Sequence, residues 1–203
     1  MKVTSLEPQR KNKERLNLYV DGVFHSGLDV GTAARLGLYE GKEVSHLEIS
    51  NIDSEDEYQK CMNAALGLAS RRLQSEREYW QKLGKKYDKP LIGRCLDRLR
   101  ELGYANDQAF AEMWIRERRD TRGRRLLENE LTQKGISKEI IASVLESSGD
   151  NSSLDAAINQ AKRKYKVSAT KEVNYSKVMS LLTRRGFSYS VAKQALDTLS
   201  DNK

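Results

Sequence analysis

A helical pattern occurs three times in the last two-thirds of this chain, and it constrains the fold more than any other feature. Leu83, Leu131 and Leu182 stand at equivalent positions, 48 and 51 residues apart. Each leucine is followed at fixed offsets by two more apolar residues, which are Ile92 and Leu96, Ile140 and Val144, and Val191 and Ala195. A period near 50 residues is typical of one supersecondary unit that is repeated and stacked.

A basic residue also recurs three positions after each leading leucine. It is Lys86, Lys134 and Arg185 in the three copies. The second and third copies read LTQKGIS and LTRRGFS, whereas the first reads LGKKYDK and has Tyr87 in place of the glycine. The glycine predicts a helix end, because it adopts the left-handed cap conformation without steric cost.

We therefore predict a mainly α-helical fold, in which a tandem array of three three-helix repeats follows a small N-terminal module that contains a β-hairpin. In the first copy, helices are expected at about 54–70, 75–86 and 89–102. The predicted divisions of the chain are 1–50, 51–103, 104–149 and 150–203.

The N-terminal module is predicted from a change in pattern near residue 14. Residues 16–20 alternate as in a strand, Asp21-Gly22 is typical of a type I′ turn, and residues 23–25 form the returning strand. We expect a loose tail before them. After them we expect a short helix over 29–36 and a third strand over 43–50.

Polar residues and glycines mark the expected helix ends. Two segments, 54–57 and 75–78, read as capping boxes, with serine at the cap and glutamate three residues later. Asp107 and Ser137 are expected to cap later helices. Glycines 103, 123, 135 and 186 are expected to break or end helices, and residues 147–153 and 166–174 read as a linker and a polar loop.

Apolar spacing predicts the core of each repeat. The aromatic residues at such positions are Tyr104, Phe110, Trp80, Trp114 and Phe187, which we expect to be buried. Two isolated cysteines, 61 and 95, provide no metal-binding set with the only histidines, 25 and 46. Each thiol is expected to be a small buried apolar group in a reducing cytosol.

Charge is distributed unevenly along the chain. The net charge is +7, but residues 1–60 carry 8 basic and 11 acidic residues, whereas residues 61–203 carry 28 and 18. The repeats therefore hold a net charge of +10, which favours a polyanionic partner for that part of the chain. Solubility alone is the alternative explanation.

The densest basic segment spans a predicted helix end, the Gly123 turn and the start of the next helix. It contains six arginines in ten residues: Arg116, Arg118, Arg119, Arg122, Arg124 and Arg125. Guanidinium groups can hold phosphates bidentately or clamp acidic patches of a protein. The alternative is a solvated face that is partly balanced by neighbouring carboxylates.

Further candidate contacts for a polyanion lie in three other places. The run Lys162, Arg163, Lys164, Tyr165 and Lys166 combines charge with a ring that could stack on a base. Lys134, Arg184 and Arg185 lie in the last turns of helices, and Arg71 and Arg72 close the first helix of copy one. Complementation of the helix dipole explains such cations without any partner.

The sequence contains no constellation of residues that predicts catalysis. It has no Walker-type phosphate loop, and the repeats contain no histidine. We predict a non-enzymatic protein without a cofactor or metal. There is no apolar run long enough for a signal peptide or a membrane span, so we expect a cytoplasmic location.

Motifs in a fixed order give the repeats a resemblance to the RecX family of bacterial regulatory proteins. They are Arg71-Arg72-Leu73 with Ser75-Glu76 and Glu78, Leu102-Gly103-Tyr104 with Asn106-Asp107 and Phe110-Ala111, Glu130-Leu131 with Lys134-Gly135-Ile136, and Arg184 to Ser188. The resemblance covers roughly 58–200. The N-terminal module, with Val20-Asp21-Gly22 and residues 38–44, resembles the extension of longer members.

The resemblance implies a regulator of RecA, the recombinase that coats single-stranded DNA as a helical filament. It implies that the chain lodges in the filament groove and restrains filament growth, ATPase activity, strand exchange and co-protease activity in recombination, repair and the SOS response. We further expect a monomer that binds single- and double-stranded DNA weakly, without sequence preference, and does not bind membranes.

A general helical DNA-binding protein, such as a nucleoid or transcription factor, is the alternative. Three-helix units have the size of small helix-turn-helix folds. A strongly preferred duplex in a competition assay would favour this alternative. However, no copy contains a distinctive row of base-reading Asn, Gln and Arg side chains.

Overall fold

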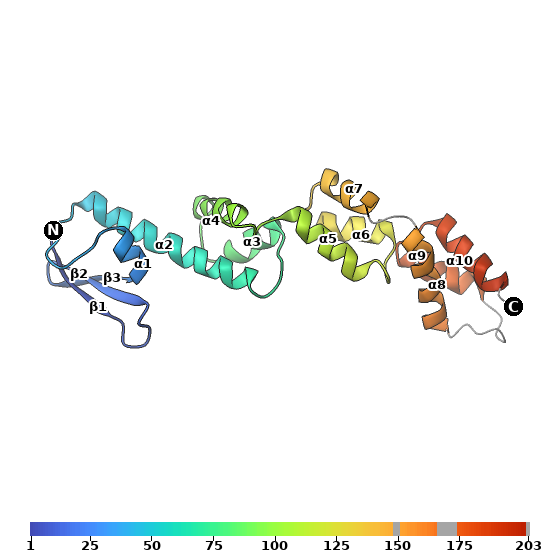
Figure 1. Ribbon diagram of the computed structural model, residues 1–203, viewed down its shortest axis with the longest axis horizontal. Helices are drawn as coiled ribbons and strands as arrows, with labels where there is room; N and C mark the ends of the chain where they lie inside the picture. Colours follow the sequence, from blue (N-terminus) through green and yellow to red (C-terminus); the bar gives the residue numbers. More distant parts are fainter. Residues whose placement is uncertain (148–150, 166–173, 202–203) are drawn as a thin grey trace. The chain divides into compact units, whose positions relative to one another are not determined.

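The computed structural model describes residues 1–147, 151–165 and 174–201 (Figure 1). The chain divides into two compact units, of which the first comprises 1–72 and 82–99 and the second comprises 73–81 and 100–203. Helices predominate, and the described strands all lie at the N-terminal end. The predicted fold class, a small β module followed by helical repeats, is therefore confirmed.

Three antiparallel strands form the sheet of the N-terminal module, in the order β1-β2-β3 (Figure 1). They are β1 (Val3–Pro8), β2 (Arg15–Val20) and β3 (Val23–Asp29). Asp21 and Gly22 join β2 to β3 with φ of 49° and 79°. Positive φ at both central positions is the requirement of a type I′ turn, so the hairpin prediction is confirmed.

The expectation of a loose tail over residues 1–13 is wrong, because β1 lies there and pairs with β2. Val3 is fully buried in the core of the module, together with Leu18 and Leu28 from the other two strands. β1 is stabilised by pairing with the next strand of the sheet, and this pairing is not evident from the spacing of apolar residues within β1 itself.

The third strand expected over 43–50 is also wrong. Glu43 makes only an isolated bridge to Lys2, and α2 (His46–Ala69) begins shortly afterwards. The capping box of α2 is formed by Ser45 and Glu48, so the segment 54–57 lies inside this helix instead of starting one. The expected division at residue 50 likewise falls within α2.

The short helix expected over 29–36 is observed as α1 (Val30–Arg35). The Asp29 side chain accepts hydrogen bonds from Gly31 N and Thr32 N, which satisfies amides at the start of α1. Gly37 follows with φ of 59°, in the left-handed region that favours glycine.

Helices of the repeats follow the predicted order. They are α3 (Glu76–Leu83), α4 (Lys89–Glu101), α5 (Asp107–Arg118), α6 (Arg124–Gln133), α7 (Lys138–Ser147), α8 (Asn151–Tyr165), α9 (Tyr175–Arg184) and α10 (Tyr189–Asp201). The loop predicted over 166–174 lies almost wholly outside the described residues, as does the middle of the linker predicted over 147–153.

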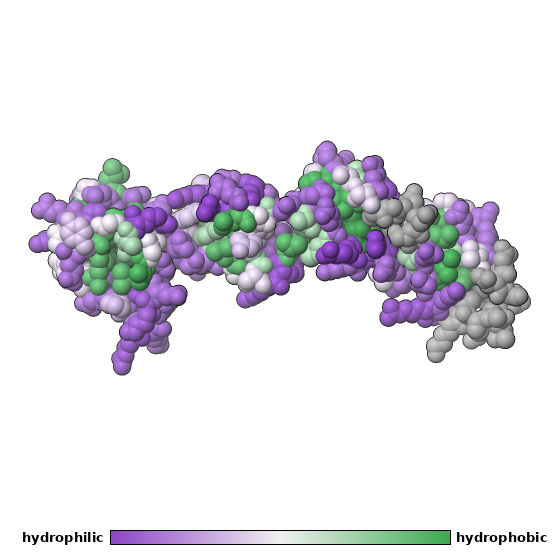
Figure 2. Space-filling view, in the orientation of Figure 1, coloured by the Kyte–Doolittle hydropathy of each residue, from purple (hydrophilic) through white to green (hydrophobic). Residues whose placement is uncertain are grey.

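The repeated apolar positions form the interior of the helices. Leu83, Leu131 and Leu182 are all buried. The second and third repeats have separate cores, one around Phe110 and Leu131 and the other around Leu182 and Leu196. On the face that Figure 2 shows, hydrophilic residues cover most of the surface, and hydrophobic residues form separate small areas.

Most of the predicted core aromatics contribute to packing. Phe110 and Phe187 are buried, and Trp80 and Trp114 are half-buried. The prediction is wrong for Tyr104, whose side chain is 46% exposed. Its carbonyl oxygen accepts a hydrogen bond of 3.3 Å from the Tyr79 hydroxyl.

Both cysteines are buried and free, as expected. Cys61 belongs to α2 and Cys95 to α4, and the two thiols are hydrogen-bonded. That hydrogen bond, together with burial, raises the pKa of the Cys95 thiol. The same hydrogen bond lowers the pKa of the Cys61 thiol, and the pair packs within the first unit.

Two of the three later cap predictions are confirmed. Ser75 Oγ accepts from Glu78 N at 3.2 Å, and Ser137 Oγ accepts from Ile140 N at 3.3 Å. The third prediction is wrong, because Asn106 caps α5. Asp107 instead accepts a hydrogen bond of 2.9 Å from Glu76 N, which lies 31 residues earlier in the chain.

Candidate polyanion-binding site

The second and third repeats meet at backbone contact. Gly123 N donates a hydrogen bond of 2.8 Å to the carbonyl oxygen of Arg185, and Arg125 N donates one of 3.2 Å to that of Gly186. A Cβ atom on Gly123 would lie 2.2 Å from Phe187 N and 2.3 Å from the carbonyl group of Gly186. Only glycine fits here without a shift, so Gly123 fixes how closely the two repeats approach.

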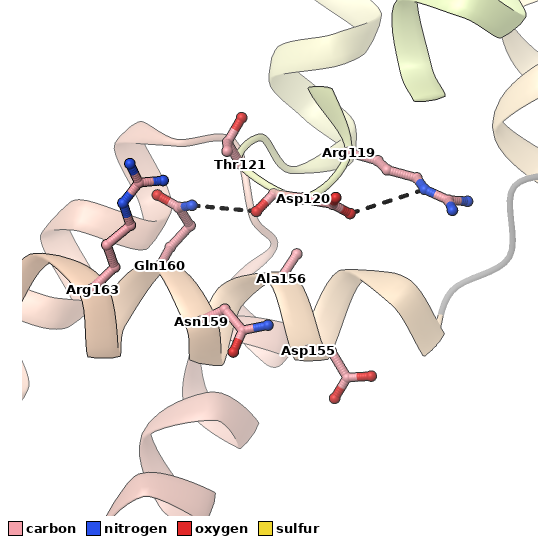
Figure 3. A pocket seen from close by; sticks show the side chains of 8 residues that line it. All are labelled: Arg119, Asp120, Thr121, Asp155, Ala156, Asn159, Gln160 and Arg163. Carbon is pink, nitrogen blue, oxygen red and sulfur yellow. Dashed lines mark hydrogen bonds and ion pairs between the residues drawn. The ribbon is translucent and has the colours of Figure 1, made fainter. Parts of the chain in front are cut away.

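Two adjoining hollows, of about 410 and 370 Å³, lie beside this contact. Thr121, Gln160 and Arg163 line both of them. Each hollow receives side chains from the connection between α5 and α6 and from α8, as Figure 3 shows for the larger one. The hollows therefore combine segments that are about 40 residues apart in the sequence.

The smaller hollow gathers cations from three segments that were separate in the sequence. Arg122 comes from the α5–α6 connection, Arg163 and Lys164 come from α8, and Arg185 follows α9. Among the residues that the structure describes, no carboxylate lines this hollow. Arg163, Lys164 and Arg185 are exposed, and none of them forms an ion pair with another residue that the structure describes.

The larger hollow is electrically mixed. Arg119 lies on its wall with its Nε 4.0 Å from the carboxylate of Asp120, and Asp155 also lines it (Figure 3). Gln160 Nε2 donates a hydrogen bond of 3.2 Å to the carbonyl oxygen of Asp120, so it connects α8 to the α5–α6 connection. This hollow is accordingly a weaker candidate for an anion than its neighbour.

Two of the six clustered arginines are used inside the second repeat. Glu130 accepts a hydrogen bond of 2.9 Å from Trp114 Nε1 and pairs with Arg122. The guanidinium carbon of Arg118 lies 3.5 Å from the centre of the Trp114 ring, and Arg118 Nε lies 4.0 Å from Glu130. We call Trp114, Arg118, Arg122 and Glu130 the Trp114 cluster. Within this cluster, the Glu130 carboxylate and the Trp114 ring offset part of the charge of Arg118 and Arg122.

Lys134 is likewise held inside the chain. Its Nζ donates a hydrogen bond of 2.6 Å to the buried carboxylate of Glu78 and lies 5.0 Å from the centre of the Trp114 ring. Its carbonyl oxygen accepts a hydrogen bond of 2.8 Å from the Ser75 hydroxyl. These contacts give Lys134 a structural role that its position in the sequence did not indicate.

The other predicted cations are distributed over both units. Arg116 and Arg125 are exposed and form no ion pair with any described residue, whereas Arg124 pairs with Glu128 at 3.1 Å. Arg184 Nε donates to the Ser180 carbonyl oxygen at 3.2 Å. Arg71 and Arg72 follow α2 in the first compact unit and do not line the hollows.

Two residues of the run from 162 to 166, Arg163 and Lys164, line the smaller hollow. Tyr165 is not among the described lining residues of either hollow. Lys162 is exposed, and Lys166 lies outside the described residues. Tyr165 packs against the core of the third repeat, and its hydroxyl donates a hydrogen bond of 3.1 Å to the Lys177 carbonyl oxygen. Stacking of Tyr165 on a base stays a prediction.

Sequence reasoning missed Thr121 and Gln160, which line both hollows. Neither side chain carries a charge or belongs to a recognisable motif, so no local signal marks them. Among the residues that the structure describes, no group of three or more His, Cys, Asp or Glu side chains could hold a metal ion. No described helix is long and apolar enough to cross a membrane.

Comparison with known proteins relates the chain to one family over most of its length. Family models described as "Regulatory protein RecX N-terminal domain", "RecX, second three-helix domain" and "RecX, third three-helix domain" match residues 1–45, 106–145 and 151–196. The Regulatory protein RecX of Listeria welshimeri serovar 6b is 35% identical over 96% of this chain and 74% of its own length. That of Clostridium perfringens strain 13 is 30% identical over 100% and 98%.

Solved structures show the same fold. A crystal structure of regulatory protein RecX matches with a TM-score of 0.77 and 24% identity, over 97% of this chain and 98% of that one. The crystal structure of RecX from Lactobacillus salivarius matches with a TM-score of 0.62 and 24% identity, over 72% and 98%.

Proposed function

Because this chain belongs to the RecX family of regulatory proteins, we propose that it binds the filament of the RecA recombinase and inhibits it. The proposed targets are filament growth, ATPase activity, strand exchange and co-protease activity in DNA recombination and repair. The chain acts by binding, without a chemical step of its own, in the cytoplasm where RecA meets the chromosome.

The observation that carries this proposal is the convergence of three basic segments on the smaller hollow. Arg122, Arg163 and Arg185 come from different parts of the chain and line one concave surface. A filament of protein on single-stranded DNA is a polyanion, and clustered cations attract such a partner over a range of about 10 Å at moderate salt. Binding should therefore weaken as the salt concentration rises.

Contact with DNA should be weak and independent of sequence. The cations that line the hollows suit phosphates, and contacts to phosphates position a protein without reading bases. This expectation separates the proposal from the alternative of a sequence-specific DNA-binding protein, which should prefer one duplex strongly in a competition assay.

The test is the DNA-dependent ATPase of RecA on single-stranded DNA, with this protein titrated from far below the RecA concentration upward. We expect inhibition at a small fraction of RecA, because a protein that stops filament growth affects many RecA molecules at once. Inhibition only at concentrations that rival the DNA binding sites would contradict the proposal and indicate competition for DNA. Unchanged ATPase activity at every ratio would also contradict it.

Charge variants connect this activity to the surface. Arg163→Glu with Arg185→Glu reverses two exposed cations that line the smaller hollow, and binding to the filament should weaken. These positions avoid Arg118 and Arg122, which take part in the Trp114 cluster. Lys138→Glu with Lys193→Glu is the matched control, because it makes the same charge change at exposed positions outside both hollows.

A further inference from the structure

The smaller hollow differs from the rest of the basic surface because none of its described lining residues is a carboxylate. Four of these seven described residues are cations, and the others are Thr121, Gln160 and Leu181. Arg119 and Arg124, which do not line this hollow, each have a carboxylate partner, and among the lining cations Arg122 pairs with Glu130. An anion that enters this hollow would therefore meet the charges of Arg163, Lys164 and Arg185, none of which pairs with a carboxylate that the structure describes.

We infer that this hollow, bounded by Arg122, Arg163, Lys164 and Arg185, binds a phosphodiester group of a nucleic-acid strand and is formed jointly by the second and third repeats. The inference deepens the proposed function and rests on it, since it specifies which component of a RecA–DNA filament this surface contacts. Arginine holds two phosphate oxygens with its planar fork, and lysine adds a point charge.

The lining favours a phosphate over an acidic protein surface. Binding hot spots between proteins are enriched in tryptophan, tyrosine and arginine packed in dry pockets. The described lining of this hollow contains no aromatic residue, and Leu181 is the only apolar residue in it. Interfaces with nucleic acid are more polar and much more positively charged, as this lining is.

The two neutral polar residues of the lining donate hydrogen bonds to the backbone of the walls, so we expect the cations to contact the ligand. The Thr121 hydroxyl donates a hydrogen bond of 3.1 Å to the Arg118 carbonyl oxygen. Gln160, which is 8% exposed, donates to the Asp120 carbonyl oxygen from α8. Both contacts fix the α5–α6 connection, and the second holds it beside the helix that carries Arg163 and Lys164.

The site also depends on the contact between repeats. Thr121 and Arg122 come from the second repeat, whereas the remaining lining residues come from the third. The close approach of Gly123 to Gly186 and Phe187 keeps these two groups together. A side chain at position 123 would move the two walls apart without removing any charge.

The decisive measurement is fluorescence anisotropy of a labelled oligothymidylate with the full chain, in the absence of RecA, over a series of salt concentrations. For Arg163→Gln with Arg185→Gln we expect weaker binding. The slope of log K against log salt should fall by about 1 for each phosphate contact that is lost. Lys138→Gln with Lys193→Gln removes the same charge outside the hollow and should leave the slope nearly unchanged.

Equal slopes for the two double variants would overturn the inference, because bulk charge would then explain the binding. The Gly123→Ala variant provides a second test once circular dichroism has shown that its helices remain. Its affinity for the oligonucleotide should fall although its charge is unchanged. Affinity equal to that of the unmodified chain would mean that the two repeats do not form the site jointly.

Binding to DNA-free RecA separates this inference from the proposed function. If Arg163→Gln with Arg185→Gln loses contact with RecA but binds the oligonucleotide normally, the hollow is a protein contact and the inference is wrong. If the same variant loses oligonucleotide binding while the unmodified chain inhibits the RecA ATPase, both statements stand. Failure of the unmodified chain to inhibit RecA overturns the proposed function alone.

Discussion

Gly123 N donates a hydrogen bond of 2.8 Å to the carbonyl oxygen of Arg185. One repeat earlier the equivalent contact runs from the Ser75 hydroxyl to the carbonyl oxygen of Lys134, also at 2.8 Å. Ser75 and Gly123 occupy the same place relative to the leading leucine of their repeats, as do Lys134 and Arg185. The start of one middle helix therefore contacts the end of the next at both positions.

The glycines that end the middle helices contribute to the same contacts. Gly135 and Gly186 have φ of 84° and 83°, which ends the helix in the left-handed conformation. A Cβ atom would lie 2.7 Å from the Arg77 side chain at position 135 and 2.5 Å from Leu126 at position 186. Helix termination and close approach thus require glycine at the same residue.

We predict that Gly123→Ala destabilises the chain by about 1–3 kcal/mol, the range for overpacking. The added methyl group would lie 2.2 Å from Phe187 N, and backbone atoms cannot rotate away. Its φ of −78° is accessible to alanine, so any loss reports the close approach and not backbone strain. Urea unfolding followed by circular dichroism measures the change in the free energy of unfolding.

Gly67→Ala is the matched control for this variant. Gly67 lies within α2, and no atom outside its own helix lies within 4 Å of an added Cβ. Alanine there should leave stability unchanged or raise it by about 0.5–1 kcal/mol, because glycine is unfavourable in a helix interior. Comparable losses in the two variants would contradict our explanation of Gly123.

We predict that Glu130→Ala destabilises the second repeat by about 1–3 kcal/mol, the cost of leaving a polar group without its partner. The change removes the acceptor of Trp114 Nε1 and the anion that pairs with Arg122. Urea unfolding gives the free energy, and tryptophan fluorescence should report the altered surroundings of Trp114.

Glu128→Ala provides the comparison for Glu130. Glu128 pairs with Arg124 one turn earlier on α6, at 3.1 Å, and both side chains are exposed. Such a pair contributes about 0.2–0.5 kcal/mol. A loss for Glu128→Ala as large as that for Glu130→Ala would show that the Trp114 cluster has no special role in stability.

We predict that Asp107→Asn changes how stability depends on pH. Burial raises the pKa of Asp107 above its ordinary value, although the hydrogen bond from Glu76 N acts in the opposite direction. The folded chain thus holds this proton more tightly than the unfolded chain. Between the two pKa values the free energy of unfolding falls as pH rises, because the folded state binds more protons there.

Asparagine keeps an acceptor oxygen for Glu76 N and carries no charge, so this contribution to the pH dependence should disappear. The stability of Asp107→Asn relative to the unmodified chain should therefore rise as pH increases above the ordinary aspartate pKa of about 4. Urea unfolding at several pH values measures the difference. A relative stability that falls with pH would reverse the sign that we assign.

Local patterns predicted the elements that local physics determines. The three-fold apolar repeat gave the middle and last helices of each copy, and Asp21-Gly22 gave the hairpin turn, because spacing and glycine conformation act within a few residues. The same reasoning failed for β1 and for the start of α2. β1 is stabilised by pairing with β2. Two segments near the start of α2 have the sequence of a capping box, and the one that caps the helix consists of Ser45 and Glu48.

The sequence by itself determined the repeat, the helical fold class and the excess of positive charge on the repeats, since each is a property of residue order. Only the tertiary structure decided which cations remain available. Arg118 and Lys134 are engaged by carboxylates and a ring within the chain, and Arg122 pairs with Glu130, whereas Arg163, Lys164 and Arg185 line one hollow beside Arg122 without an ion pair to any described residue. The reason is physical: Lys134 meets Glu78 across 56 residues of sequence, and the hollow joins segments about 40 residues apart, so both depend on how the helices pack.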